Sequence, residues 1–371
     1  MSASVQSRPG FTEVARQAAL DAGFELFGIT PVRGQDFKEL EYFPQWIEAG
    51  RAGEMEYLKS RNEAGELKRA SLHNVAPWAK SVIVCGLNYN SDETRSDDPH
   101  DPTAGWISRY AWFQQSEAKG GDYHEAVLRR LREVEAKLSH DGELRSWCYV
   151  DTGPLVERVY AKYAGLGWMG KNTCIINEEM GSFFFLGVIL TSFEFGDDMT
   201  PPMPAADRCG SCTRCIDACP TQALAPYQLD AARCISYLTI EKRGALPEEF
   251  RAAMGRHVFG CDICQDVCPW NGAKDATRRA PLAKAAEFQP RRELVNPALE
   301  WLAAMSKDDF NRVFKNSPIK RAKYQGFRRN VAIALGNSCE KSARPGLERM
   351  AADDDPVVAE HARWGLGRLD P

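Results

Sequence analysis

The stretch CGSCTRCIDACP, from Cys209 to Pro220, is the most informative part of the chain. Its four cysteines follow the spacing Cys-x2-Cys-x2-Cys-x3-Cys, and a proline comes directly after the last of them. A second stretch, CDICQDVCP from Cys261 to Pro269, repeats the end of this pattern without its first cysteine. One further cysteine, Cys234, lies between the two stretches. Such clustering indicates metal binding rather than disulfide bonds.

The spacing is typical of bacterial ferredoxins, in which three cysteines of a run bind one [4Fe–4S] cluster and the fourth reaches a second cluster. Two clusters need four thiolates each, and the two stretches together with Cys234 supply them. Zinc is the alternative, because four closely spaced cysteines can also bind that ion; the Cys-x3-Cys-Pro endings favour clusters. We predict one cluster on Cys209, Cys212, Cys215 and Cys268, and another on Cys219, Cys234, Cys261 and Cys264.

Composition limits the class of protein. The chain has 371 residues, of which 44% are hydrophobic and 26% charged, with a formal net charge of −4. This length allows two or three domains, and the charge excludes a globally basic nucleic-acid binder but not a local basic surface. No apolar run has membrane-spanning length, and the N-terminus resembles neither a secretory nor a twin-arginine signal, so we expect a cytoplasmic protein.

The region before the cysteines is predicted to be mixed α/β. Apolar patterns indicate helices over residues 11–22 and 124–138, buried strands over 81–87 and 182–191, and a further strand over 147–150. The loop Gly165–Gly170 has the letters of a dinucleotide-binding motif, but no clear strand precedes it, so a structural turn is the simpler interpretation. Prolines at 201, 202 and 204 mark a boundary, and we predict domains at 1–200, 201–275 and 276–371.

The last of these regions is predicted to be helical. Leu335-Gly336 and Leu366-Gly367 each end an alanine-rich stretch, which resembles HEAT-like helix pairs. Fewer than three repeats are visible, so these helices would have to pack on the rest of the protein.

Several further motifs occur in a fixed order along the chain, and together they resemble the epoxyqueuosine reductases, cobalamin-dependent iron–sulfur enzymes of tRNA modification. The absence of a twin-arginine signal separates the chain from the related reductive dehalogenases. The motifs are Ser108-Arg109-Tyr110, Gly121-Asp122-Tyr123-His124, Val150-Asp151-Thr152-Gly153-Pro154, Ala164-Gly165-Leu166-Gly167-Trp168, Gly170-Lys171-Asn172, Gly181-Ser182-Phe183-Phe184-Phe185 and Arg233-Cys234-Ile235-Ser236-Tyr237.

The resemblance implies the last step of queuosine synthesis, in which an epoxide on the wobble nucleoside of tRNA is reduced to an alkene with loss of water. Two electrons and two protons are consumed. The clusters would pass electrons singly from an external donor to base-off cobalamin in the α/β domain. The implied protein is a monomer with an α/β cobalamin-binding domain, a ferredoxin-like two-cluster domain and a helical HEAT-like region that contacts the tRNA anticodon stem-loop.

Asp151 is the predicted proton donor. It lies where a strand ends and a turn begins, and opening an epoxide leaves an alkoxide that needs a proton. Burial against a corrin would raise the pKa of this carboxyl, which would keep it protonated. A turn-forming aspartate is the alternative. His124 and Tyr123 open a helix near this site, where a surface role is the usual interpretation for histidine.

The resemblance also implies a set of cobalamin contacts. Arg69 would bind a corrin amide or a phosphate, and the alternative is a solvent-exposed charge on a helix. For Ile175 and Leu186 the alternative is that they are ordinary core residues of a strand. The cysteines outside the cluster stretches are interpreted as free buried cysteines, and Cys174 is the one whose distance from the cofactor needs checking; these cysteines are Cys85, Cys148, Cys174 and Cys339. The implied contacts are Arg69, Ser108, Asp151, Ile175, Leu186, Ser236 and Asp262.

Residues 310–339 contain no Asp or Glu, which is unusual in an acidic chain. Tyr324 and Phe327 are interleaved with the basic residues, so we predict a phosphate-contacting surface for tRNA, with a solvated charged face as the alternative. Two other functions stay open: a corrinoid reductase of a small molecule, and a ferredoxin-type electron carrier. The predicted tRNA contacts are Lys320, Arg321, Lys323, Arg328 and Arg329.

Overall fold

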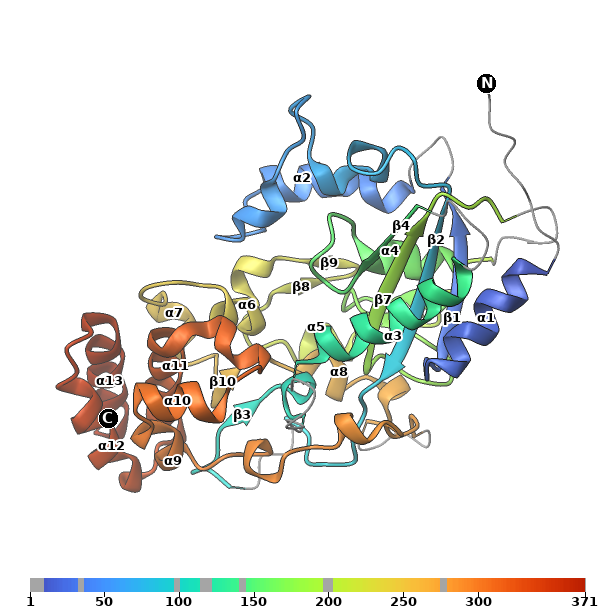
Figure 1. Cartoon of the computed structure of the whole chain (residues 1–371). Coiled ribbons are helices and arrows are strands. Elements are labelled where there is room, and N and C mark those ends of the chain that lie inside the picture. The colour runs from blue at the N-terminus through green and yellow to red at the C-terminus, as the bar shows by residue number, and fades with distance from the viewer. Residues whose placement is uncertain are drawn as a thin grey trace.

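The computed structural model describes residues 10–32, 37–96, 101–113, 122–139, 145–195, 203–273 and 279–370. A four-stranded antiparallel sheet has the order β1-β2-β7-β4. The strands are β1 (Leu26–Pro31), β2 (Ser81–Asn88), β4 (Ser146–Tyr149) and β7 (Phe184–Thr191). In Figure 1 the sheet lies at one end of the molecule, the C-terminal helices lie at the other, and the cysteine-rich segment lies between them.

Helices cover both faces of this sheet, which explains why its two central strands are almost continuously apolar. On one face α1 (Phe11–Asp21) and α3 (Tyr123–Leu138) pack on residues that include Ile83, Cys85 and Ile189. On the other face α4 (Glu157–Tyr163) packs on alternate residues of the same strands. The predicted helices and strands of this region are therefore confirmed, with ends shifted by one or two residues; β2 and β7 are buried almost throughout, whereas β4 is only partly buried.

The glycine-rich loop is partly a hairpin. Its residues Trp168–Met169 form β5, which pairs with β6 (Ile175–Ile176). A Cβ atom on Gly167 would lie 2.2 Å from the Ile176 carbonyl oxygen, so this position needs glycine for the two chains to approach. Strands of two residues leave no apolar alternation, which is why the sequence predicted only a turn.

The cysteine-rich segment is built from short elements: α5 (Arg214–Asp217), β8 (Leu224–Ala225), β9 (Gln228–Leu229), α6 (Ile235–Ile240), α7 (Glu248–Arg251), β10 (His257–Phe259) and α8 (Ile263–Asp266). β10 pairs in parallel with β3 (Trp106–Ile107), which precedes the sheet strand β4 in the chain. The segment is therefore joined to the α/β region by backbone pairing. The boundary predicted at residues 201–202 and the motif residue Gly121 lie outside the described residues.

The C-terminal helices pack tightly on one another and on the preceding segment. A Cβ atom on Gly336 would lie 2.5 Å from the Cα atom of Gly365, so glycine allows α11 and α13 to touch. Trp106 and Trp112 belong to the same core as these helices, which means that this core crosses the linear division of the chain. The helices are α9 (Leu299–Ala304), α10 (Lys307–Val313), α11 (Lys323–Ser338), α12 (Arg344–Ala351) and α13 (Pro356–Leu369).

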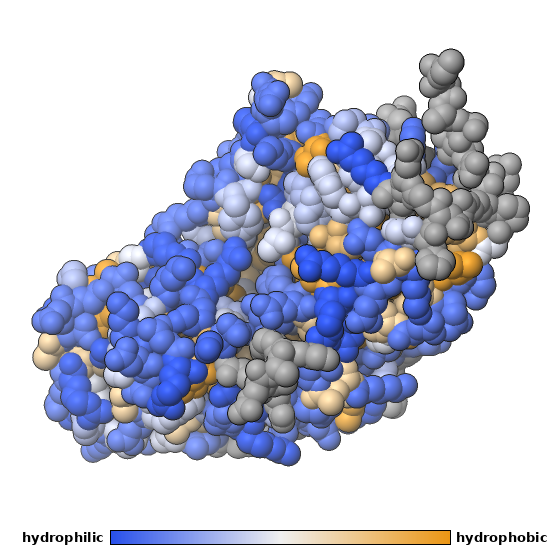
Figure 2. Space-filling view, in the orientation of Figure 1, coloured by the Kyte–Doolittle hydropathy of each residue, from blue (hydrophilic) through white to orange (hydrophobic). Residues whose placement is uncertain are grey.

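Hydrophilic side chains cover most of the face shown in Figure 2, over the C-terminal helices in particular. None of the helices in the described part of the chain combines the length and apolar character of a membrane-spanning segment. One remaining helix, α2 (Tyr42–Glu48), lies at the edge of the molecule above the cysteine-rich segment (Figure 1).

Candidate active site and cluster-binding loops

Four of the cysteines form one group at the exposed side of the cysteine-rich segment. Burial, together with the nearby Cys209 and Cys212, raises the pKa of Cys215 to about 11. Burial likewise raises the pKa of Cys268 to about 12, with Cys209 and Cys215 among its neighbours. Cys268 belongs to the second sequence stretch, so the two stretches cross over as their spacing predicts.

The other four cysteines form a second, deeper group. Burial raises the pKa of Cys261, and the neighbouring thiols of Cys234 and Cys219 raise it further. Cys264 lies close to Cys261 and Cys234. Buried thiols with raised pKa values hold their protons until a metal binds, so loading this group with iron would release protons.

A ninth cysteine adjoins the second group. The thiols of Cys174 and Cys264 form a hydrogen bond, which raises the pKa of Cys264 and lowers that of Cys174. Cys174 lies between β5 and β6 and therefore comes from the α/β region. The second group of cysteines thus faces the α/β region directly.

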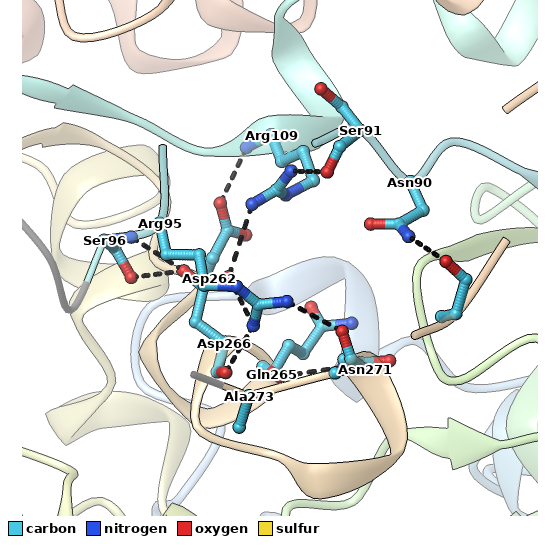
Figure 3. Close-up of polar contacts among 12 residues, drawn as sticks. Asn90, Ser91, Arg95, Ser96, Arg109, Asp262, Gln265, Asp266, Asn271 and Ala273 are labelled. Atoms are coloured by element: carbon cyan, nitrogen blue, oxygen red, sulfur yellow. Dashed lines mark hydrogen bonds and ion pairs between the residues drawn. The ribbon is translucent and has the colours of Figure 1, made fainter. Parts of the chain in front are cut away.

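A buried network of charges fixes the second cysteine stretch against the α/β region (Figure 3). Ser108 Oγ donates a hydrogen bond to Asp262 Oδ1 over 2.5 Å, and the backbone N–H of Arg109 donates to Asp262 Oδ2 over 2.7 Å. Arg109 Nη2 lies 3.4 Å from Asp266 Oδ1. The Arg109 and Asp266 side chains are 1% and 0% exposed, so this ion pair is isolated from water.

The same network holds the far end of the stretch. Arg95 donates hydrogen bonds to the carbonyl oxygens of Asp266 and Asn271, over 2.6 and 2.7 Å. Arg109 also lies over the rings of Trp112 and Phe183, at 5.1 and 4.9 Å from their centroids. Burial, followed by the charge of Asp266, raises the pKa of Asp262 to about 6. No sequence pattern indicated these roles for Arg95, Arg109 and Asp266.

Asp151 lies in a different environment, on the loop that follows β4. Its φ of 55° is left-handed, an uncommon conformation for a residue other than glycine, and its side chain is 57% exposed. The Tyr123 hydroxyl donates a hydrogen bond to Asp151 Oδ2. His124 Nε2 lies 3.9 Å from the same oxygen. The protein alone therefore leaves the predicted proton donor accessible to a large substrate.

Arg69 stabilises this loop through hydrogen bonds. It donates one hydrogen bond to the Gly153 carbonyl oxygen and another to the Tyr57 carbonyl oxygen, both over 2.8 Å. Arg69 is only 9% exposed, so the alternative that it is a solvated charge on a helix is wrong. The sequence did not indicate this contact, because Arg69 and Gly153 are far apart along the chain.

Tyr110 connects the two sites. Burial raises its pKa, and the charges of Asp262 and Asp151 raise it further. Tyr110 directly follows Arg109, whose backbone N–H donates to Asp262. Its ring packs edge-on against that of Tyr123 at 5.8 Å. The proposed proton donor and the buried network beside the second cysteine group therefore lie on either side of one tyrosine.

Glu157 was missed by the sequence analysis. Its Oε1 atom is buried, and none of the described residues forms a hydrogen bond with it. Burial, followed by the charge of Asp151, raises its pKa to about 8. A glutamate in the first turn of an exposed helix would give the same sequence pattern, so nothing in the sequence distinguished it.

The other predicted cofactor contacts come from separate elements. Ile175 is buried in β6, and Leu186 packs against the same hydrophobic cluster. Leu186 is partly exposed, although every other residue of the central strand β7 is buried. Ser236 is partly exposed and lies in the first turn of α6, directly after Cys234.

The basic C-terminal surface differs from the prediction. Arg329 is 1% exposed, and its guanidinium donates to the carbonyl oxygens of Leu238, Lys242 and Gly244. Its predicted contact with phosphate is wrong, because these carbonyls occupy a guanidinium that burial holds away from solvent. Arg328 is 18% exposed at its side chain and pairs with Asp353 over 2.7 Å.

The other predicted basic residues lie nearer the solvent. Arg321 and Lys323 are exposed, and Lys320 is partly exposed with its ammonium 4.8 Å from the Phe310 ring centroid. Arg321 pairs with Glu241 and lies over the Tyr57 ring. The charge of Arg321 also reaches Tyr110 and His124, which places it at the edge of the Asp151 site.

Known proteins match the chain in the same two regions. Residues 208–271 match a family model for a 4Fe-4S double cluster binding domain, and residues 69–152 match one for epoxyqueuosine reductase QueG, DUF1730. The epoxyqueuosine reductase of Xanthomonas campestris pv. campestris is 37% identical, over 98% of this chain and 99% of that protein. That of Pseudomonas aeruginosa is 38% identical, over 94% and 91%.

The chain belongs to the epoxyqueuosine reductase family. It is therefore an oxidoreductase with a double [4Fe–4S] cluster-binding domain. A crystal structure of epoxyqueuosine reductase with an epoxyqueuosine-modified tRNA-Tyr stem loop matches with a TM-score of 0.82 and 32% identity, over 97% of this chain and 90% of that one.

A Bacillus subtilis epoxyqueuosine reductase with its catalytic loop swung out of the active site matches over the same shares, with a TM-score of 0.79 and 32% identity.

Proposed function

We propose that this protein reduces epoxyqueuosine to queuosine at the wobble position of tRNA, with Asp151 as the proton donor and cobalamin beside the second cluster. The position of Tyr110 supports this most strongly. Its ring packs on that of Tyr123, whose hydroxyl donates to Asp151, and it directly follows Arg109, whose backbone N–H donates to Asp262. Asp262 directly follows Cys261, a predicted cluster ligand. Electrons and protons would therefore arrive at one place from two sides.

The proposed cluster ligands are the two groups of four cysteines described above. The loop around the first group is exposed at Gly210, Ser211 and Thr213, whereas Asp262 beside the second group is buried. An external electron donor would thus reach the first cluster, and the second cluster would pass electrons inward. Cys174 supports this direction because its thiol contacts Cys264 from the α/β side.

The residues on the α/β side fit a corrin. Leu186 presents apolar surface in an otherwise buried strand, and the unpartnered Glu157 Oε1 provides an acceptor for an amide. When bound, cobalamin would supply a cobalt centre that accepts electrons one at a time. The residues proposed to hold it are Arg69, Ser108, Asp151, Ile175, Leu186, Ser236 and Asp262.

Asp151 would give its proton to the substrate oxygen as the epoxide opens. A carboxyl must be protonated to do this, and an ordinary aspartate is ionised at neutral pH. RNA and corrin surfaces that displace water from its 57%-exposed side chain would disfavour the charged carboxylate and favour the protonated form. Arg69 and Tyr123 would hold the loop in place while the proton is transferred.

The tRNA would bind at the edge of this site. Arg321 supports this placement, since its side chain is 47% exposed and its charge reaches His124. Lys320, Lys323 and the less exposed Arg328 would extend the surface along α11 and the turn before it. Because its substrate is tRNA, we place the protein in the cytoplasm, as a monomer with a HEAT-like C-terminal region.

The test is anaerobic reconstitution with iron, sulfide and cobalamin, followed by an assay on epoxyqueuosine-containing tRNA. We expect absorbance from both clusters and the corrin, and conversion to queuosine. Asp151→Asn should retain both cofactors and lose about 100-fold or more in turnover. A protein that binds clusters but no corrin would indicate an electron carrier, and one that reduces only small halogenated compounds would indicate a dehalogenase-like enzyme.

A further inference from the structure

The proposed reaction needs two protons, but Asp151 can carry only one at a time. Removing the epoxide oxygen as water breaks two C–O bonds; it consumes two electrons, which enter through the clusters, and two protons. The first proton converts the alkoxide to a hydroxyl, and the second converts the departing hydroxide to water. After the first transfer Asp151 is a carboxylate, so it must regain a proton before the second.

His124 is placed to return that proton. Its Nδ1 atom lies 2.6 Å from Asp122 Oδ1, an arrangement that holds the Nδ1 proton and directs Nε2 elsewhere. Nε2 lies 3.9 Å from Asp151 Oδ2. This separation is slightly longer than a hydrogen bond, and a small rotation of Asp151 or one water molecule would close it.

The surroundings keep the imidazole in this orientation. Its ring stacks on that of Tyr123 with centroids 4.1 Å apart. The side chain is 30% exposed, so solvent can reload the ring with a proton. Asp122 also accepts a hydrogen bond from the His124 backbone N–H, which makes it the N-cap of α3. Capping of α3 uses the Asp122 side chain and the His124 backbone N–H, so it does not explain why the imidazole ring is held in this position.

We propose that His124, oriented by Asp122, transfers a proton from solvent to Asp151 Oδ2 between the two protonation steps. In each transfer the imidazolium Nε2–H bond breaks and the Asp151 O–H bond forms; the neutral ring then takes a proton from water. His124 acts through Asp151 and does not contact the substrate. The inference rests on the proposed function.

The charged groups around His124 favour its protonated form. Burial by itself would lower the pKa of the imidazole. The hydrogen bond and charge of Asp122, with the charge of Asp151, outweigh burial and raise the pKa; Arg321 from the C-terminal region opposes them. Glu241 forms an ion pair with Arg321 and so weakens the lowering effect of Arg321 on the pKa of His124. The ring is therefore charged over more of the neutral range than an ordinary histidine.

The first experiment needs no cofactor and follows the histidines of the full-length protein by NMR. The chain has six histidines, and the His124 signal is identified by its loss in His124→Gln. We expect its titration above pH 6.5, with a shift to lower pH in both Asp122→Asn and Asp151→Asn. Titration at an ordinary value that neither substitution moves would contradict the proposed arrangement.

The second experiment measures turnover of the reconstituted enzyme against pH. In the wild type the rate should fall as pH rises through the pKa of His124, because the imidazolium is the proton source. His124→Gln should lower the rate about 100-fold and abolish this dependence, and added imidazole should restore part of the rate. Asp122→Asn should move the dependence to lower pH. His73→Gln, at an exposed histidine, is the matched control.

These outcomes separate the two proposals. If the wild type does not reduce epoxyqueuosine, the proposed function fails, whatever the NMR titration shows. If the wild type is active but His124→Gln keeps its full rate and its pH dependence, the proton-transfer role is wrong. A slower His124→Gln enzyme with unchanged pH dependence and no rescue by imidazole would likewise reject the role, in favour of a purely structural one.

Discussion

The second cysteine stretch and the Asp151 loop face the same tyrosine but are held in different ways. The stretch is fixed by a buried ion pair and several backbone hydrogen bonds from the α/β region. The Asp151 loop is exposed, has a left-handed residue and is held by contacts from Tyr123 and Arg69. Electron transfer requires a constant distance, whereas proton delivery to a bound tRNA requires an accessible group. The fixed cysteine stretch therefore suits electron transfer, and the exposed Asp151 loop suits proton delivery.

The largest effect is expected from removing a ligand on the fixed side. Cys261→Ser should abolish turnover, because the second cluster could no longer pass electrons inward. Iron analysis should show loss of about one cluster, four irons of eight. Cys339→Ser, at an exposed cysteine outside both groups, is the control and should retain both clusters. Full activity in Cys261→Ser would reject the proposed electron path.

Breaking the buried ion pair should destabilise the fixed side. Arg109→Met removes the closer of the two arginines that pair with the buried Asp266 carboxylate, with Arg95 remaining at 3.9 Å, so we expect a loss of about 3 kcal/mol in the free energy of unfolding. Denaturant unfolding of the apoprotein measures this. Arg312→Met, at a 75%-exposed arginine, should change stability far less. Equal, small effects in the two variants would mean that the network does not fix the stretch.

Acid should loosen the packing of the C-terminal helices on the cysteine-rich segment. His361 is fully buried, its Nε2 accepts a hydrogen bond from the Leu246 N–H, and burial lowers its pKa to about 4. A lowered histidine pKa contributes stability above pH 6.5 that is lost as pH falls towards 4. The loss should reach up to about 3 kcal/mol in chemical unfolding. His361→Gln should remove this pH-dependent part, and an unchanged pH dependence would contradict it.

On the exposed side, Tyr123→Phe should release the Asp151 carboxylate without disturbing the core. A hydrogen bond to a charged group contributes about 1.5–3 kcal/mol, so turnover should fall about 10-fold or more while cluster and corrin absorbance stay unchanged. Tyr163→Phe, whose hydroxyl bonds to Glu39 instead, is the control. If both variants behave alike, Tyr123 does not hold the loop.

The smallest effect is expected at the tRNA surface. Arg321→Gln should weaken tRNA binding a few-fold and reduce the salt dependence by about one phosphate contact. Binding measured at several salt concentrations gives both values. Arg349→Gln, on α12 in the part of the C-terminal region far from the sheet in Figure 1, should change neither. Equal effects in the two variants would mean that Arg321 is not part of the tRNA-binding surface.

Features that depend on local spacing could be predicted from the sequence. The crossing of the two cysteine stretches follows from their intervals, and in the structure Cys268 lies near Cys209 and Cys215 while Cys261 lies near Cys219 and Cys234. The buried strands and the long helices follow from apolar periodicity, which records burial directly. The ordered motifs predicted the family, which the relatives confirm.

Features that depend on contacts between distant residues could not be predicted. The lack of acidic residues in 310–339 predicted a basic surface, but Glu241 and Asp353 reach it from outside that range, and carbonyls of another segment bury Arg329. Likewise, no local pattern reveals that Tyr123 and His124 face Asp151 or that Arg109 pairs with Asp266. The sequence by itself determined the chemistry this protein can carry. Only the tertiary structure decided which charges stay in water and which are buried in pairs, because burial and pairing depend on segments that meet only in the folded chain.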